Sequence, residues 1–160
     1  MIQAALSYHK QKVIQALRYH FINKREIKLL IILVNVFALV SALLYSLKNV
    51  SPAAFMLGSL LWFLLMLTFW FILPRVIYNR TGIFQQTFRL TIDNQHLALT
   101  NDSGEVNWSW NKFESWLESP HFFHVYLTPT QFMLIPKEIF SDDEQVHTIR
   151  RWLKEGIAKA

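Results

Sequence analysis

The fold is decided by a stretch that runs from Leu29 to Leu47 and reads LLIILVNVFALVSALLYSL, without a charged residue. At about 1.5 Å per residue it forms a helix roughly 28 Å long, which matches the hydrocarbon core of a bilayer. A short polar turn follows. A second uncharged stretch, rich in Leu, Phe and Trp, then extends from Ala53 to Leu73 and is closed by Pro74. The sequence therefore predicts two antiparallel transmembrane helices, at 29–47 and 53–73, within the segment 29–74.

A soluble hairpin and a signal peptide both fit these apolar stretches less well than membrane helices do. A buried hairpin of a soluble protein would need a larger domain around it, because both stretches are apolar on every face. A cleavable signal peptide would have only a short charged segment before a compact apolar core, whereas the polar segment 1–28 precedes a full-length span. The sequence therefore favours insertion in a membrane.

A net charge of +5 is compatible with binding to nucleic acid, so it is necessary to see where the basic residues lie in the sequence. The excess of basic residues lies beside the apolar stretches, while the chain from Phe84 to Ala160 has seven basic and ten acidic side chains. An acidic domain is a poor partner for phosphate backbones, and nucleic acid is not an expected partner. Cysteine is absent, which excludes disulfide scaffolds, thiolate nucleophiles and zinc sites that use cysteine.

The orientation of the hairpin follows from the positive-inside rule, which counts Lys and Arg close to the ends of the spans. Basic residues flank the outer ends of both spans, at Lys24, Arg25, Lys28, Arg75 and Arg80. The turn between the spans has only Lys48. A multi-pass protein with both termini in the cytoplasm is therefore expected.

The segment 1–28 contains two expected elements. Tyr8 to Arg25 places Val13, Leu17 and Phe21 on one helical stripe, which predicts a basic amphipathic helix. This helix either lies in the lipid headgroup layer or packs against the later β domain, and the sequence leaves both open. The short apolar run Met1–Ser7 is a candidate strand that adds to the β sheet.

After Gly82 the apolar pattern changes from helical to alternating, which is typical of half-buried strands. Six strands are predicted, at 88–93, 96–100, 106–111, 113–118, 122–128 and 131–136. Trp108 and Trp110 fall on the apolar face and are expected in the core.

A C-terminal amphipathic helix is predicted behind the strands. Ser141 and Glu144 form a capping box, in which Ser141 accepts from the backbone of Glu144. Val146, Ile149 and Ile157 belong to the buried stripe. The predicted fold class is therefore membrane α plus β: a two-helix transmembrane hairpin followed, over 84–160, by a small bent sheet or partial barrel capped by this helix.

Several of these pieces together resemble a known family. The Trp-x-Trp at 108–110, the strand that ends in FMLIPKEIF and the helix SDDEQVHTIRRWLKEGI are similar to YcxB-like bacterial membrane proteins, as is VIQALRYHFINKRE before the first span. The most specific piece is Ile135–Phe140. The resemblance implies a pleckstrin-homology-like (PH-like) domain after two membrane helices in a bacterial inner membrane, and it implies no activity.

Two residues are candidate contacts on the domain. Trp116 lies between Glu114 and Glu118 on the face opposite the apolar one, so it is the better candidate for an exposed aromatic contact. Lys137 can contact a lipid phosphate or a partner protein. The alternative is that Lys137 is simply solvated.

No catalytic, cofactor-binding or metal-binding constellation is recognisable. The six histidines are scattered, and His121 and His124, three residues apart on a strand, point to opposite faces. Ser, Thr, Asp and Glu lie mainly in turns and caps, and no Gly-rich phosphate loop exists. We therefore expect neither an enzyme nor a cofactor, and no small-molecule substrate is evident.

The leading functional hypothesis is a non-enzymatic, membrane-anchored interaction module whose cytoplasmic domain binds a membrane or cytoplasmic protein, or lipid headgroups. The alternative is a subunit or immunity-type inhibitor that acts on a membrane protein inside the bilayer. The aromatic-rich second span, with Trp62, Phe63, Phe69, Trp70 and Phe71, suggests this alternative.

Overall fold

The computed structural model describes residues 1–157 and forms two compact units. One unit contains Met1–Ala16 together with the chain from Thr81 onward, and the other is Leu17–Arg80. The first unit is therefore built from two segments that lie far apart in the sequence. Helix α1 (Lys10–Asn23) begins in the first unit and ends in the second.

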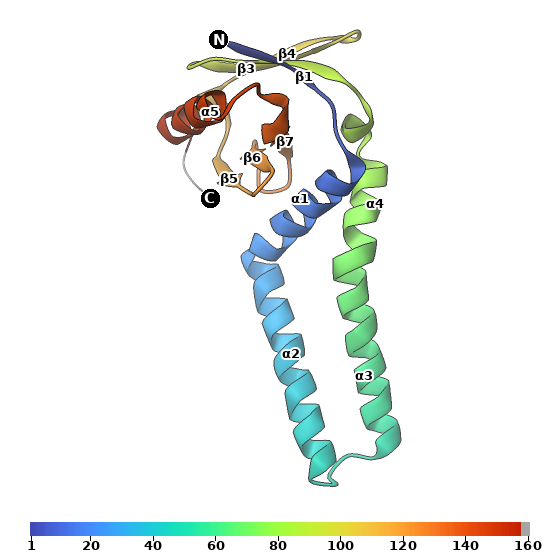
Figure 1. Ribbon diagram of the computed structural model, residues 1–160. Helices are drawn as coiled ribbons and strands as arrows, with labels where there is room; N and C mark the ends of the chain where they lie inside the picture. The colour runs from blue at the N-terminus through green and yellow to red at the C-terminus, as the bar shows by residue number, and fades with distance from the viewer. Residues whose placement is uncertain (158–160) are drawn as a thin grey trace. The chain divides into compact units, whose positions relative to one another are not determined.

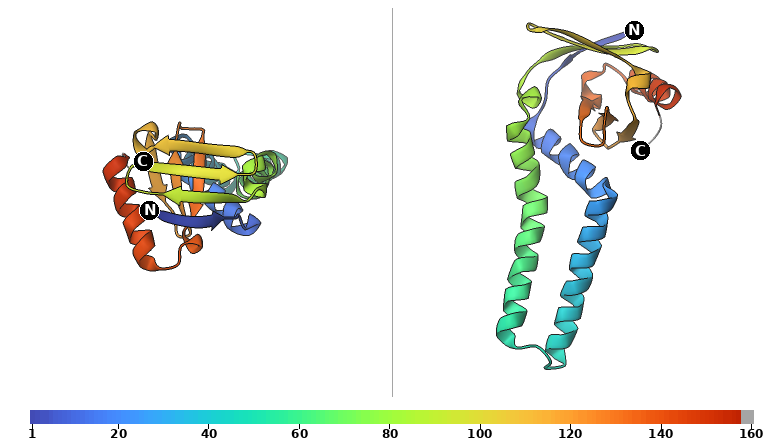
Figure 2. Two further views of the ribbon diagram at one scale, coloured as in Figure 1. Left: turned by 90° about the horizontal axis from the view of Figure 1, so that it is seen from above. Right: turned by 180° about the vertical axis from the view of Figure 1, so that it is seen from behind.

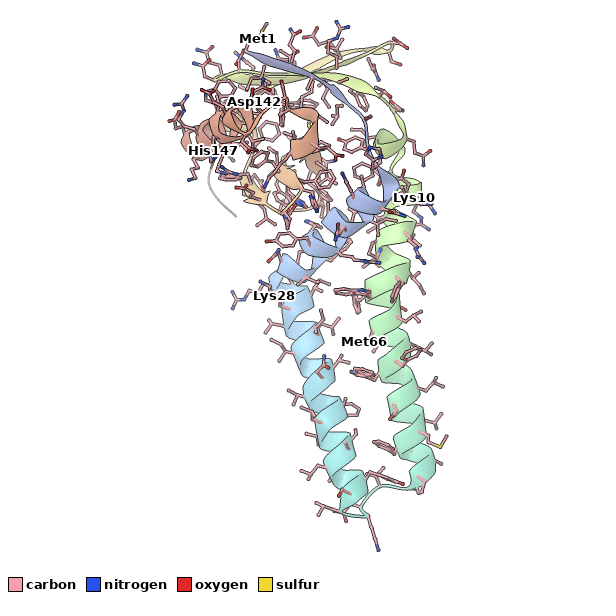
Figure 3. The ribbon with its side chains drawn as sticks, viewed as in Figure 1. Met1, Lys10, Lys28, Met66, Asp142 and His147 are labelled. Carbon is pink, nitrogen blue, oxygen red and sulfur yellow. The ribbon has the colours of Figure 1, made fainter. Side chains whose placement is uncertain are left out.

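The second unit is dominated by two long apolar helical stretches (Figure 1). Helix α2 (Arg25–Ser46) and the continuous stretch Pro52–Arg80 are both long and apolar enough to cross a membrane. Neither α2 nor α3 (Pro52–Leu67) has a buried residue. Figure 3 shows their side chains, which consist almost entirely of carbon, projecting outward along both helices.

The second helical stretch does not stop at Pro74, as the sequence had suggested. A π-helical turn, η1 (Thr68–Ile72), follows α3, and α4 (Leu73–Arg80) continues the helix beyond the proline. Pro74 has no N–H to donate to the carbonyl of Trp70, four residues earlier. That carbonyl accepts a hydrogen bond from Arg18 Nε at 2.9 Å instead. This bond and the wider π turn allow the helix to pass through the proline.

The turn between α2 and α3 has the features of a tight helical connection. Ser51 caps α3, with its hydroxyl accepting from the backbone N–H of Ala54 at 3.3 Å, and Pro52 occupies the first helical position. Lys48 has a positive φ of 59°. Helix α2 therefore ends at Ser46 and α3 begins at Pro52, where the sequence predicted an interruption.

The first unit contains a four-stranded antiparallel sheet in the order β1-β2-β3-β4. Its strands are β1 (Ile2–Leu6), β2 (Phe88–Ile92), β3 (His96–Asn101) and β4 (Gly104–Ser109). Strand β1 lies within the N-terminal segment 1–28 and pairs with β2, from Ile2 opposite Ile92 to Leu6 opposite Phe88. Figure 2, in its left view, shows the four strands side by side with helix α5 at one end of them. A short 3₁₀ turn, η2 (Gly82–Gln85), precedes β2.

A second antiparallel sheet, in the order β5-β6-β7, faces the first. Its strands are β5 (Ser115–Glu118), β6 (Phe122–Tyr126) and β7 (Phe132–Pro136). The chain passes from β4 to β5 through a 3₁₀ turn, η3 (Trp110–Lys112), so Trp110 is not the strand residue that alternation had predicted. Helices followed by two antiparallel sheets and a C-terminal helix are thus the observed architecture.

The core lies between the two sheets and α5. It contains buried side chains from the other six strands, including Leu90, Leu97, Trp116, Phe123 and Ile135, while β4 contributes the partly buried Trp108. Every residue of β6 is buried, on both faces of its sheet. The first turns of α1 lie beside the face of the three-stranded sheet that points away from the four-stranded sheet (Figure 1). Val13 and Ala16 of α1 are buried there.

Helix α5 (Asp143–Gly156) starts one residue later than predicted. The cap is Asp142, whose carboxylate accepts from the backbone N–H of Gln145 at 2.7 Å, and not Ser141. Ser141 instead exchanges two hydrogen bonds with the side chain of Gln145, at 2.9 and 3.4 Å. Asp and Ser cap helices about equally well, so the sequence alone does not choose between them. A further 3₁₀ turn, η4 (Lys137–Ile139), connects β7 to this helix.

Gly156 at the end of α5 packs directly on Trp110. A Cβ atom at position 156 would lie 2.7 Å from the Cβ of Trp110. We expect Gly156→Ala to lower the free energy of unfolding by about 1–3 kcal/mol, because Trp110 is buried and must shift. Gly82→Ala is the control, since a Cβ there meets no atom within 4 Å. Thermal unfolding in detergent followed by circular dichroism compares the two, and equal melting temperatures would contradict the prediction.

Candidate functional site

Trp116 is part of the core, and the prediction that it is exposed is wrong. Its side chain is 1% exposed and packs against Phe123, with ring centroids 6.3 Å apart. Opposite it in the neighbouring strand is Val125, which is also buried. The Trp116 side chain therefore faces the core, although Glu114, just before β5, is exposed.

Lys137 points inward and is held by an ion pair. Its Nζ lies 2.6 Å from Oε1 of Glu118 and 5.1 Å from the centre of the Phe123 ring. The side chain of Lys137 is 19% exposed. Lys137 and Trp116 therefore both contact Phe123, but inside the domain and not on a shared outer surface.

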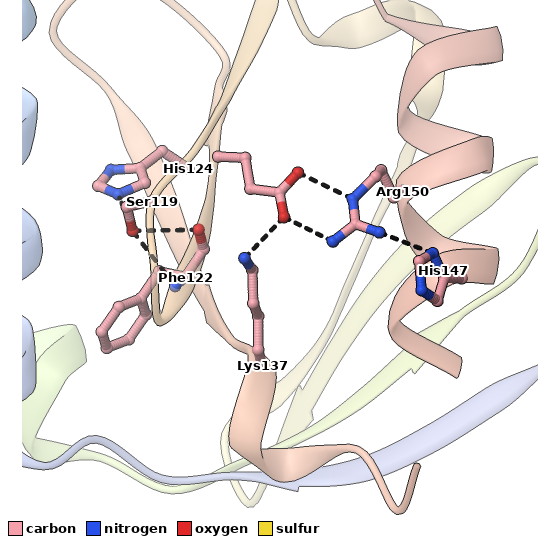
Figure 4. Close-up of polar contacts among 7 residues, drawn as sticks. Ser119, Phe122, His124, Lys137, His147 and Arg150 are labelled. Carbon is pink, nitrogen blue, oxygen red and sulfur yellow. Dashed lines mark hydrogen bonds and ion pairs between the residues drawn. The ribbon is translucent and has the colours of Figure 1, made fainter. Parts of the chain in front are cut away.

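Arg150 of α5 completes this cluster (Figure 4). Its guanidinium binds Glu118 through two parallel hydrogen bonds, Nε to Oε2 at 2.9 Å and Nη2 to Oε1 at 2.7 Å. A third contact joins Arg150 Nη1 to His147 Nδ1 at 2.8 Å. The hydrogen bond from Arg150, opposed by burial and reinforced by the hydrogen bond from Lys137, lowers the pKa of Glu118 to about 2. One ionised carboxylate thus joins β5, η4 and α5.

A second polar pair, Ser119 and His124, is fully enclosed. His124 Nε2 lies 3.0 Å from Ser119 Oγ, and the same hydroxyl bonds to the backbone of Phe122 (Figure 4). Both side chains are buried, with exposed fractions of 4% and 0%. This arrangement closes the turn between β5 and β6 and gives no access to a substrate.

The outer face of the four-stranded sheet carries polar side chains arranged in rows. One row places Arg89, Thr100 and Glu105 side by side on three neighbouring strands. The next row contains Gln3, Thr91, Ala98 and Asn107. Because alanine is the shortest side chain among longer neighbours, the face is hollowed at its centre, with a volume of about 420 Å³.

Asp93 and His96 lie at one end of this hollow. Oδ1 of Asp93 accepts the backbone N–H groups of Gln95 and His96, at 2.7 and 2.8 Å. The bond from Gln95 is the main reason that the pKa of Asp93 is lowered. The hollow therefore carries a fixed negative charge at this end. This surface was not predicted from the sequence. The alternation of Arg89, Thr91 and Asp93 with the apolar residues of β2 did indicate that one face of the strand is polar.

The hairpin has its own concave surface, an apolar groove between α2 and α3 with a volume of about 830 Å³. Its walls include Leu33 and Phe37 from α2, and Gly58 and Trp62 from α3. The sequence had singled out Trp62 among the aromatic residues of the second span. Among residues 1–157, no group of three or more His, Cys, Asp or Glu is placed to hold a metal ion.

Comparison with known proteins gives one match. Residues 92–153 match the family model described as YcxB-like protein. No curated protein and no solved structure matches the chain.

Proposed function

The chain carries a YcxB-like domain, and from this premise we propose that it is a membrane-anchored, non-enzymatic interaction module. The hairpin of α2 and α3–α4 spans a bacterial inner membrane, and the domain binds a membrane or cytoplasmic protein on the cytoplasmic side. The observation that carries the proposal is that neither α2 nor α3 has a buried residue, although both are long and mostly apolar.

The energetic reason for the anchoring is the apolar surface of these helices. Leu33, Leu39 and Met56 are 67, 72 and 70% exposed, and similar values recur along both helices. Exposing so much contiguous apolar surface to water costs about 25 cal/mol for each Å², far more than a soluble domain tolerates. A bilayer removes that cost, and the backbone hydrogen bonds are satisfied within the helices.

The charge distribution supports a cytoplasmic position for both ends of the chain. The five basic residues Lys24, Arg25, Lys28, Arg75 and Arg80 all flank the ends of the hairpin away from the turn. The positive-inside rule places these ends in the cytoplasm. The YcxB-like match begins at residue 92, after Arg80 and without a further span between them, so the domain lies on the same side.

The arrangement of the domain supports a PH-like fold. A four-stranded and a three-stranded antiparallel sheet enclose one core, and a C-terminal helix closes it. The partner that such a domain binds is determined by the residues on its surface and not by its fold. The surface we assign to the partner is the polar hollow of the four-stranded sheet, where Arg89 and Glu105 offer charges of both signs.

The interaction is tested by photocrosslinking in living cells. A photoreactive benzophenone amino acid replaces Asn107, which is exposed in the hollow and uncharged. The matched control carries the same group at Thr130, an exposed residue in the turn between β6 and β7. We expect a discrete adduct from position 107 and none from position 130. No adduct from position 107, or the same adducts from both, would contradict a partner at this surface.

A further inference from the structure

One end of the second unit concentrates positive charge. Six basic residues lie there, before the first span or after the second: Arg18, Lys24, Arg25, Lys28, Arg75 and Arg80. Glu26 is the only acidic residue between Leu17 and Arg80. Within residues 1–157, none of these six side chains forms an ion pair. The charge is therefore available to an anionic ligand from outside the chain.

Two of the six, Arg18 and Arg75, are positioned by one aromatic ring. The guanidinium carbon of Arg18 lies 5.4 Å from the centre of the Phe71 ring, and that of Arg75 lies 5.9 Å from it. Arg18 is fixed further by its hydrogen bond to the Trp70 carbonyl and by a contact of 5.4 Å with the Trp70 ring. Pro74 contributes to this geometry, because it leaves that carbonyl without its usual donor.

Arg18 keeps unused hydrogen-bond donors in this position. Its Nε is the nitrogen that binds Trp70, and no acceptor among residues 1–157 binds its two terminal amino groups. Guanidinium groups bind phosphate through such paired donors. Trp70 beside them is a residue of the type found at the boundary between lipid and water.

The groove between α2 and α3 lies nearer the turn of the hairpin than these arginines do. Leu65 lines the groove, and the helix continues from there through η1 to Trp70 and Phe71. The volume of about 830 Å³ is within the range of sites that enclose small apolar ligands. A Cβ built on Gly58 in the groove wall meets no atom within 4 Å. The groove is therefore open at Gly58, in the part of its wall nearer the turn.

We propose that this end of the hairpin binds one anionic phospholipid, with its phosphate on Arg18 and Arg75 and an acyl chain in the groove. The proposal rests on the proposed function, because it requires the hairpin to lie in a bilayer. Charge complementarity decides the occupant. An apolar helix would fill the groove but leave the arginines unpaired, and a zwitterionic lipid would bring an ammonium group beside six basic residues.

The test is native mass spectrometry of the full chain released from micelles that contain equal amounts of phosphatidylglycerol and phosphatidylethanolamine. We expect one bound phosphatidylglycerol. The double variant Arg18→Gln, Arg75→Gln should bind it about 100-fold more weakly, because it removes two direct guanidinium–phosphate contacts and each charge-assisted hydrogen bond contributes about a factor of ten. The matched control, Arg25→Gln with Arg80→Gln, removes the same charge away from Phe71 and should bind nearly as well as the parent.

A second variant tests the groove without touching the arginines. Gly58→Leu fills open space in the groove wall and should also weaken lipid retention. Equal loss in both double variants would overturn the site in favour of diffuse attraction, and equal retention of both lipids would overturn the headgroup assignment. A dimer without lipid that dissociates in Gly58→Leu would assign the groove to a second copy instead.

Co-flotation with vesicles, measured on the same preparations, separates this proposal from membrane anchoring. Flotation without lipid retention would contradict the lipid site alone. A parent protein that does not float with the vesicles would contradict the proposed function itself.

Discussion

Replacing Trp116 with alanine is expected to lower the free energy of unfolding by about 3–5 kcal/mol. The side chain is 1% exposed, belongs to the core between the two sheets, and contacts Phe123. The alanine variant leaves a large cavity that the surrounding strands cannot close. Chemical denaturation in detergent, followed by circular dichroism of the β structure, measures the loss.

Trp116→Phe is the matched control for this experiment. The indole Nε1 of Trp116 is buried, and the described residues offer it no hydrogen-bond partner, so phenylalanine removes no hydrogen bond. We expect this variant to lose less than about 1.5 kcal/mol. An alanine variant as stable as the parent would show that the ring is not in the core. The alanine variant is accordingly unsuitable for testing partner binding, because it destabilises the whole domain.

The second large effect is expected at Glu118. The Glu118→Gln variant should lower the free energy of unfolding by about 2 kcal/mol at pH 7, because it leaves Lys137 and Arg150 without their anionic partner. Glu138→Gln is the matched control, since Glu138 pairs with Lys12 on the surface and both side chains are well exposed. Exposed pairs contribute about 0–1 kcal/mol.

The stability of the parent should depend on pH through the same carboxylate. The pKa of Glu118 is lowered from 4.5 to about 2 in the folded state. Its contribution is therefore complete above the unfolded pKa of 4.5 and is lost as the pH falls through the folded pKa of about 2. The difference in stability between the parent and Glu118→Gln should shrink over that interval. Denaturation at pH 7 and pH 3 measures it, and a difference that stays constant would contradict the ion-paired state of Glu118.

The strands were predictable from sequence because each has one strongly apolar face. Phe88, Leu90 and Ile92 alternate with polar residues, and β2 (Phe88–Ile92) is where this pattern predicts it. The two long helices were predictable for a similar reason, since uncharged length is a direct physical requirement for a span. The strands and the two long helices were therefore predictable because each depends on a pattern of neighbouring residues in the sequence.

The position of Trp116 was not predictable in the same way, because both faces of its sheet are buried. Alternation assumes that one face meets water, yet the whole of β6 is enclosed. The glutamates around Trp116 suggested exposure. Glu118 is instead paired with Lys137 and Arg150, which are distant in sequence, and no local signal reports such partners.

The continuation of the helix through Pro74 also depends on a distant residue. Proline removes one helical donor and ordinarily ends a span. Arg18, which is 52 residues away in sequence, donates to the carbonyl affected. Sequence reasoning identified Arg75 and Trp70 separately but had no means of bringing Arg18 to them.

The placement of the hairpin across a membrane is tested most directly by cysteine accessibility, because the native chain has no cysteine to label. One variant carries Asn49→Cys in the turn between the spans, and the other carries Ser103→Cys in the exposed turn between β3 and β4. A membrane-impermeant maleimide is added to spheroplasts and then to lysed membranes. We expect Cys at position 49 to be labelled in intact spheroplasts and Cys at position 103 only after lysis. Labelling of both positions only after lysis would contradict a hairpin that crosses the membrane.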